Sequence, residues 1–175
     1  EDVSRLSPDQ EEEILGKSCD VLTKLTGSKP LGWTAPGWGM NVGTIDLLRR
    51  HGFLYDNSLM EFDVPTVFEF PEGPLFELSI SLALDDWQQF GVDLASGGQG
   101  YASIEDAFSL WRAELMGLSF YNGLFSPTFH PNLVGRPGTL RALASLLEDF
   151  REGHGIWWTN GINIARHCEK IYAKK

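Results

Sequence analysis

Two patterns of apolar residues alternate along this chain, a helical spacing of three or four residues and short continuous runs. Apolar residues spaced three or four apart predict helices, which we expect to begin near residues 7, 41 and 103 and to cover residues 140–150 and 162–172. Short apolar runs closed by Gly, Pro or Asp predict strands at residues 31–34, 53–55, 67–70, 75–80, 125–130 and 156–158. Strands and helices thus alternate, with one hairpin around residues 71–74. This order is typical of an α/β fold with a largely parallel sheet.

The run that ends at His130 places a histidine where a strand should stop. Pro131 has no N–H to give to a sheet ladder, and Gly135 and Pro137 then turn the chain into the next helix. The carboxyl ends of parallel strands are where α/β folds hold their ligands and their chemistry. His130 is therefore the leading candidate for a catalytic acid or base, and a locally packed histidine is the alternative.

Other side chains near predicted strand ends could join His130. Asp85 and Asp86 are adjacent, and two neighbouring carboxylates cannot both be buried without partners. We expect one to orient the imidazole and the other to cap a turn, and a solvated turn pair is the alternative. Aromatic side chains beside proline make good walls for sugars and other ring-shaped ligands, and ordinary core packing is their alternative role. The residues of this kind after the first strand are Trp33, Pro36 and Trp38.

Composition and charge narrow the function classes. The 175 residues are 42% hydrophobic and 22% charged, which is typical of one globular domain, here expected over residues 1–175. A formal net charge of -10 argues against nucleic acid or an anionic membrane as partner. The two cysteines form no disulfide framework, which leaves the compartment open and favours the cytoplasm. No His-x3-His or Cys-x2-Cys occurs, so we expect no metal site from these residues alone.

Four sequence motifs carry a resemblance to a known family. They are LGWTAPGW at residues 31–38, TIDLLRRHGFLYDNSLM at 44–60, LDDW at 84–87 and FHPNLVGRPG at 129–138. Together they resemble the polysaccharide deacetylase (NodB-homology) family. With IARH at residues 164–167, they are most similar to the branch that holds peptidoglycan deacetylase-like and allantoinase-like enzymes. The resemblance extends over nearly the whole chain.

The resemblance implies a distorted (β/α) barrel of the NodB-homology type, of which this chain is the C-terminal part, with the N-terminal strands missing. It implies hydrolysis of a non-peptide C–N (amide) bond in carbohydrate metabolism, with a divalent metal, usually zinc, activating water in the complete enzyme. Carried onto this chain, His130 would protonate the leaving amine and Asp85 or Asp86 would orient it. The substrate would contact Trp33, Pro36, Trp38 and Trp87.

The same resemblance marks what this chain lacks. The family motifs that supply the base and the metal ligands would lie upstream of the first helix, and Thr34 stands where the family commonly has an arginine. We therefore expect the chain alone to bind no metal and to be incomplete for catalysis. Two hypotheses follow. The chain is part of a deacetylase-like hydrolase acting on a carbohydrate or a small amide, or it is a non-catalytic carbohydrate-binding or interaction protein. Self-association as a homo-oligomer is a further expectation.

Overall fold

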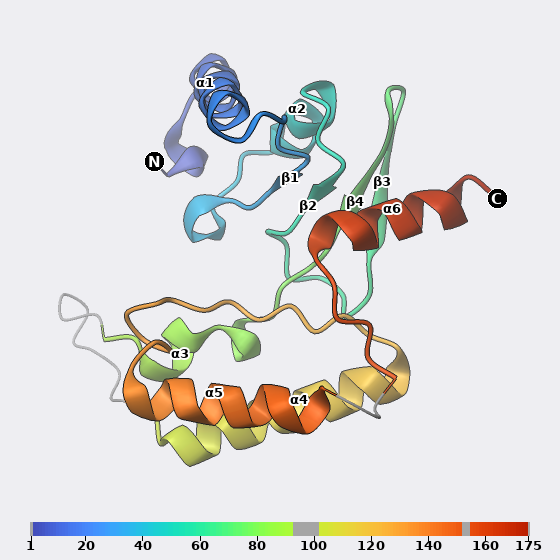
Figure 1. Cartoon of the computed structure of the whole chain (residues 1–175). Coiled ribbons are helices and arrows are strands. Elements are labelled where there is room, and N and C mark those ends of the chain that lie inside the picture. The colour runs from blue at the N-terminus through green and yellow to red at the C-terminus, as the bar shows by residue number, and fades with distance from the viewer. Residues whose placement is uncertain (1, 93–101, 152–154, 175) are drawn as a thin grey trace. The chain divides into compact units, whose positions relative to one another are not determined.

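A computed structural model describes residues 2–92, 102–151 and 155–174 (Figure 1). The chain divides into two compact units, one of residues 1–79 with 159–175 and the other of residues 80–158. The expectation of a single domain over residues 1–175 stays a prediction. Among the described residues, no helix is both long enough and apolar enough to cross a membrane.

The first unit is built on a sheet with the strand order β1-β2-β4-β3. The β1–β2 and β2–β4 pairs are parallel, and β3 and β4 form an antiparallel hairpin, so the expected mainly parallel sheet with one hairpin is confirmed. The strands are β1 (Gly32–Trp33), β2 (Tyr55–Asp56), β3 (Thr66–Phe70) and β4 (Gly73–Glu77). The α-helices are α1 (Pro8–Thr26), α2 (Thr44–Arg50) and α6 (Gly161–Tyr172), with short 3-10 turns at Val3–Arg5 and Pro36–Trp38.

Local sequence signals set the ends of α1. The Ser7 side chain accepts a hydrogen bond from the Gln10 amide, and the Gln10 side chain accepts one from the Ser7 amide, which completes a capping box. Pro8 occupies the first helical position, where its missing N–H costs nothing. Gly27 ends the helix in the left-handed conformation. These features confirm the predicted helix.

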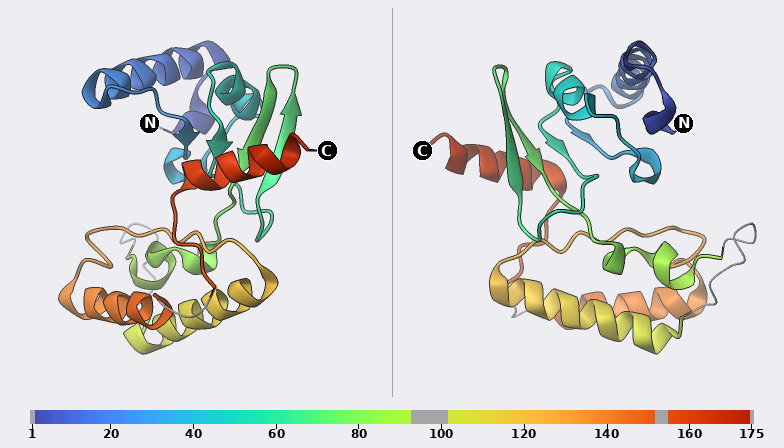
Figure 2. Two further views of the ribbon diagram at one scale, coloured as in Figure 1. Left: turned by 45° about the vertical axis from the view of Figure 1, so that its right-hand side comes forward. Right: turned by 180° about the vertical axis from the view of Figure 1, so that it is seen from behind.

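Helices cover both faces of the sheet. Leu75 and Phe76 are neighbours on β4, so their side chains point to opposite faces. Leu75 belongs to a core cluster that α1 and α2 supply, with Leu15, Cys19, Leu47, Leu48 and Phe53. The ring centroids of Phe76 and Tyr172 of α6 lie 6.5 Å apart in an edge-to-face arrangement. α6 contacts both β2 and β4 (Figure 2). The inner strand β4 is therefore covered on both faces, as a strand with a parallel neighbour requires.

Two buried carboxyl groups face each other at the ends of β2 and β4. Asp56 and Glu77 are partners in the parallel register, and neither has exposed surface. Burial and the neighbouring Asp56 carboxyl raise the pKa of Glu77 to about 9. Burial also raises the pKa of Asp56, against hydrogen bonds from Ser58 that favour its charged form. The pair therefore holds a proton at neutral pH.

This pair makes the stability of the protein depend on pH. Between the ordinary Glu value of 4.5 and about 9, folded Glu77 binds a proton that unfolded Glu77 has lost. The free energy of unfolding is highest below the lower value and falls as pH rises through the upper one, on the order of 1 kcal/mol per unit. We expect urea midpoints between pH 5 and 9 to fall in the wild type and to stay flatter in Glu77→Gln. Equal slopes in the two proteins would contradict this assignment.

The second unit is mainly helical. Its elements are a 3-10 turn at Leu82–Leu84 and the helices α3 (Asp86–Phe90), α4 (Ile104–Tyr121) and α5 (Pro137–Phe150). α4 and α5 lie side by side (Figure 2). Trp111 of α4 is 1% exposed at the centre of the unit's core and contacts Phe90, Phe108 and Phe129 edge to face. Its indole N–H donates to the Ala83 carbonyl at 2.9 Å, which satisfies the polar atom of this buried ring.

Two predicted strands are wrong in this unit. Among the described residues, the segment 125–130 forms one isolated β-bridge, the parallel bridge between Thr128 and Asp85. Pro127 and Pro131 on either side remove the amide donors that a longer ladder needs. Residues 156–158 are irregular, and there the Trp158 indole N–H donates to the Phe150 carbonyl at the end of α5. The short helix α3 was not predicted, since its five residues show too little periodicity.

Candidate active site

A short set of backbone hydrogen bonds brings Asp86 and His130 together. The Thr128 amide donates to the Leu84 carbonyl, and the Asp86 amide donates to the Thr128 carbonyl, both at 3.0 Å. Asp85 caps α3 by accepting a hydrogen bond from the Trp87 amide at 2.9 Å, which fixes Asp86 in the first turn. Positions 86 and 130, far apart in the sequence, therefore become neighbours.

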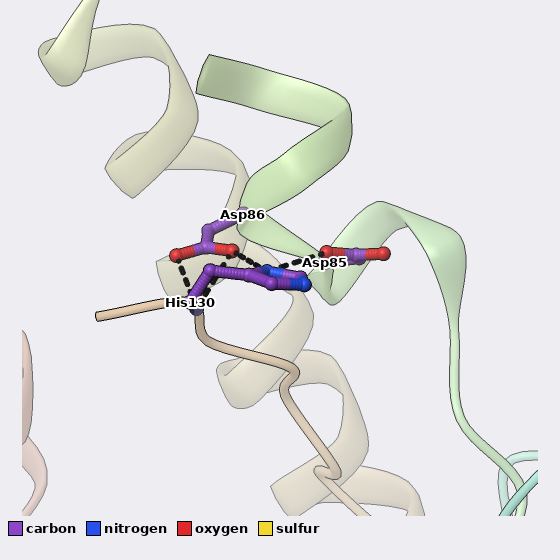
Figure 3. Close-up of side chains that lie close together, drawn as sticks. All are labelled: Asp85, Asp86 and His130. Carbon is purple, nitrogen blue, oxygen red and sulfur yellow. Dashed lines mark hydrogen bonds and ion pairs between the residues drawn. The ribbon is translucent and has the colours of Figure 1, made fainter. Parts of the chain in front are cut away.

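The Asp86 carboxylate accepts hydrogen bonds from the His130 turn, and Figure 3 shows its contacts with His130. Its Oδ1 lies 2.6 Å from His130 Nδ1, and its Oδ2 accepts from the His130 amide at 2.9 Å and from the Val134 amide at 3.2 Å. Asp86 has no exposed surface, whereas the His130 side chain is 39% exposed. A carboxylate only accepts hydrogen bonds, so Nδ1 carries a hydrogen and Nε2 is left to exchange a proton with a ligand.

Asp85 plays a different part from its neighbour. Its Oδ1 lies 3.8 Å from His130 Nδ1, too far for a hydrogen bond, and the carboxylate is committed to the Trp87 amide. The Trp87 side chain is 41% exposed, and its ring lies 5.4 Å from the imidazole at a tilt of 58°. The exposed imidazole thus has an apolar wall beside it, which suits a ligand with a flat or sugar-like face.

The turn after His130 is tightly built. The amides of Leu133 and Val134 both donate to the His130 carbonyl, and the Thr139 hydroxyl bonds to the Leu133, Val134 and Arg136 carbonyls at 3.0 Å each. A Cβ at Gly135 would lie 2.1 Å from the Pro131 carbonyl oxygen. Only glycine fits there, and the turn that carries the Val134 amide to Asp86 depends on it.

Replacing Gly135 by alanine should strain this turn. We expect Gly135→Ala to lower the free energy of unfolding by about 1–3 kcal/mol, the usual cost of forcing an atom into occupied space. Gly117→Ala is the matched control, because Gly117 lies in α4 with nothing within 4 Å of its added methyl group. That change should raise stability by up to about 1 kcal/mol through helix propensity. Urea unfolding measures both, and equal effects would contradict the steric argument.

The other predicted substrate contacts belong to the first unit. Trp33 and Trp38 are half-buried there and Pro36 is exposed. The Trp33 ring packs against the core cluster of α1, α2 and β4. Trp33 therefore has, at least in part, the core-packing role that was the alternative to substrate binding. Trp38 is not among the residues of that cluster. The roles of Trp33, Pro36 and Trp38 as a substrate wall stay predictions.

The arrangement of Asp85, Asp86 and His130 also bears on metal binding. One ligand atom from each lies within 4.8 Å of the others. However, Asp86 already accepts from three N–H groups, and His130 Nδ1 is one of those donors. Asp85 and the Nε2 atom of His130 remain, whereas zinc takes three or four protein ligands. Within the described part of the chain, this group fits a hydrogen-bonded acid pair and does not fit a complete zinc site.

Sequence reasoning missed the backbone contribution to this site. The amides of His130 and Val134 hold Asp86 as firmly as the imidazole does. The short distance between Pro131 and Gly135 in the sequence was the available signal, since both residues favour a tight turn. The choice of Asp86 over Asp85 had no such signal, because the two carboxylates are adjacent and chemically alike.

Comparison with known proteins shows which proteins this chain is similar to. No family model matches the chain. A peptidoglycan deacetylase from Helicobacter pylori is 27% identical over 183 residues, covering 89% of this chain and 62% of that protein. A crystal structure described as a polysaccharide deacetylase from Mycobacterium smegmatis is 35% identical, with a TM-score of 0.91 over 98% of this chain and 60% of that chain. An allantoinase structure is 28% identical, with a TM-score of 0.78 over 93% of this chain and 54% of the other.

These similarities cover nearly all of this chain and little more than half of each solved neighbour. They confirm the expected α/β fold of the NodB-homology type, of which the chain forms a part. The motifs at residues 31–38, 44–60, 84–87 and 129–138 lie inside the shared region, since the match to the mycobacterial structure leaves out only a few residues. Over nearly its whole length, the chain is therefore similar to polysaccharide deacetylases of the NodB-homology type.

Proposed function

We propose that this chain is part of a hydrolase that breaks a non-peptide C–N bond, the amide of an N-acetylated carbohydrate, and that His130 protonates the leaving amine. One observation carries the proposal. A fully buried carboxylate, Asp86, lies 2.6 Å from Nδ1 of a partly exposed histidine, so Nε2 is the ring nitrogen that remains for a ligand. This is the arrangement that a general acid needs.

Amide cleavage depends on such an acid. An amine leaves poorly as an anion, so its nitrogen must gain a proton as the C–N bond breaks. A doubly protonated imidazole gives that proton from Nε2 and keeps the hydrogen on Nδ1. Asp86 stabilises the positive ring before transfer and holds its orientation afterwards. Asp86 acts through His130 and is a positioning residue.

The remaining site residues would hold the substrate. Trp87 lies beside the imidazole and offers an apolar face to a sugar ring. Asp85 fixes Trp87 through the cap of α3. In the first unit, Trp33, Pro36 and Trp38 are proposed, by resemblance to the family, to contact a substrate.

The water-activating part of the reaction is assigned to no residue of this chain. A divalent metal, zinc by family resemblance, would activate water in the complete enzyme, and Asp85, Asp86 and His130 do not provide its ligand set. We therefore propose that the described chain alone is incomplete for turnover. Both cysteines are free thiols, which suits a reducing compartment such as the cytoplasm.

The names of the relatives support a carbohydrate substrate. Two of the similar proteins are described as a peptidoglycan deacetylase and a polysaccharide deacetylase, and the third is an allantoinase. An N-acetylated glycan is therefore the first substrate to test, and allantoin is the second. A non-catalytic carbohydrate-binding protein is the alternative function, and it is favoured by the incomplete zinc ligand set of the described site.

The test compares two proteins on the same substrates. The protein purified from its natural source and the 175-residue chain are each incubated with an N-acetylglucosamine tetramer or with allantoin. Acetate, ureide products and saccharide binding are measured. Acetate release by the natural protein and none by the chain supports the proposal. Product from allantoin would change the substrate, and binding without product in both proteins would establish the non-catalytic alternative.

A further inference from the structure

The aromatic segment of residues 33–38 has an uncommon backbone. Gly37 and Trp38 follow one another with φ values of 61° and 63°, both in the left-handed region. Glycine adopts this region freely, but a tryptophan there is strained and must be held by its surroundings. Backbone strain of this kind is found most often at active sites and ligand-binding sites, where it orients a side chain. The neighbours of the segment should therefore show what holds it.

The centre of the segment is anchored by a serine from the β2 end. Ala35 is 2% exposed, and its amide donates to Ser58 Oγ at 2.8 Å. The Ser58 hydroxyl donates in turn to Asp56 Oδ1 at 2.7 Å, and the Ser58 amide donates to Asp56 Oδ2 at 3.2 Å. A hydroxyl can accept and donate at once, so the Ser58 hydroxyl links the Ala35 amide to the Asp56 carboxyl. We call this pair of hydrogen bonds the relay.

Glu77 supports this relay from the neighbouring strand. Its side chain has no exposed surface, and Glu77 is the register partner of Asp56 on the parallel strand. Glu77 Oε1 also accepts a hydrogen bond, at 3.0 Å, from the amide of Leu59, the residue that follows Ser58. Asp56 is thus held by β4 on one side and by the Ser58 turn on the other.

We propose that Asp56 and Ser58, supported by Glu77, are positioning residues that hold Trp38 in the left-handed conformation needed to present its ring to a saccharide. This inference rests on the proposed carbohydrate substrate and adds to it the residues that shape the binding wall. Trp38 is half-buried and lies three residues from the anchored Ala35 amide. The relay therefore acts at the base of the segment that carries the ring.

The test uses two measurements on the 175-residue chain. Hydrogen exchange of the Ala35 amide reports the anchor, and titration with an N-acetylglucosamine tetramer, followed by tryptophan fluorescence, reports binding. The test variant is Ser58→Ala, which removes the hydroxyl that links the Ala35 amide to Asp56. Ser79→Ala is the matched control, because Ser79 is buried after β4 and its hydroxyl has no partner among the described residues.

We expect Ser58→Ala to speed exchange of the Ala35 amide and to weaken saccharide binding, each by about tenfold, which matches one lost hydrogen bond. Ser79→Ala should change each quantity by less than about twofold. The urea midpoint of each variant shows whether the unit still folds. In the wild type itself, an Ala35 amide that exchanges as fast as in an unfolded peptide would overturn the proposal without any variant.

The outcomes separate this inference from the proposed function. Unchanged saccharide affinity in a folded Ser58→Ala variant overturns the positioning role and leaves the substrate assignment intact. Faster Ala35 exchange in that variant, with no saccharide binding in the wild type, supports the anchor and overturns the carbohydrate substrate. Faster exchange together with weaker binding supports both.

Discussion

Replacement of His130 by glutamine should lower amide hydrolysis by about two to four orders of magnitude, the usual contribution of a positioned acid or base. Glutamine can donate a hydrogen bond but cannot give up a proton at neutral pH. The loss should appear in kcat with little change in KM, because the proton moves only as the C–N bond breaks. Since the His130 side chain is 39% exposed, the fold should survive the change.

The control for this variant is a second histidine. His51 ends α2 and lies 3.5 Å from Glu12, so it interacts with a carboxylate as His130 does. His51→Gln should leave turnover within about twofold. Both variants are made in the natural gene and assayed by acetate release. Wild-type kcat in a folded His130→Gln protein would contradict the assigned role.

Changing Asp86 to asparagine should damage both turnover and stability. An amide side chain has one acceptor oxygen, and three N–H groups point at this position. One buried donor would lose its partner, which costs about 1–3 kcal/mol. The imidazole would also lose the negative charge that stabilises its protonated form, so kcat should fall by about two orders of magnitude or more.

Asp85→Asn is the matched control for that change. Asparagine can still accept the Trp87 amide hydrogen bond, and it is as good a helix cap as aspartate. Its unfolding free energy should change by less than about 0.5 kcal/mol and its kcat by less than about tenfold. Urea unfolding and initial rates measure both quantities. A larger loss in Asp85→Asn than in Asp86→Asn would reverse the roles of the two carboxylates.

The sequence predicted the parts of the fold that depend on local chemistry. The capping box of Ser7 and Gln10 and the left-handed Gly27 fix α1 from a few adjacent residues. The 71–74 turn likewise predicted the β3–β4 hairpin. Residues 125–130 looked equally strand-like, but Pro127 lies within the run and only Thr128 pairs. An apolar run alone does not show whether its amides find partners.

The candidate site shows the same division. His130 and the aspartate pair were predicted from their places at expected strand ends, and the structure brings Asp86 and His130 into contact. Which aspartate contacts the histidine depends on the bridge between Asp85 and Thr128, a pairing 43 positions apart in the chain that no local pattern reveals. The pairing of Asp56 with Glu77 could not be predicted for the same reason, since only the β2–β4 register makes them neighbours.

The central claim is that His130 protonates a leaving amine, and a comparison of two leaving groups tests it most directly. Wild-type and His130→Gln proteins are assayed on an N-acetylglucosamine oligomer and on 4-nitrophenyl acetate, whose leaving group departs without a proton. We predict a loss of about two to four orders of magnitude on the amide and less than about tenfold on the ester. Equal losses on both substrates would show that His130 does not act as the acid.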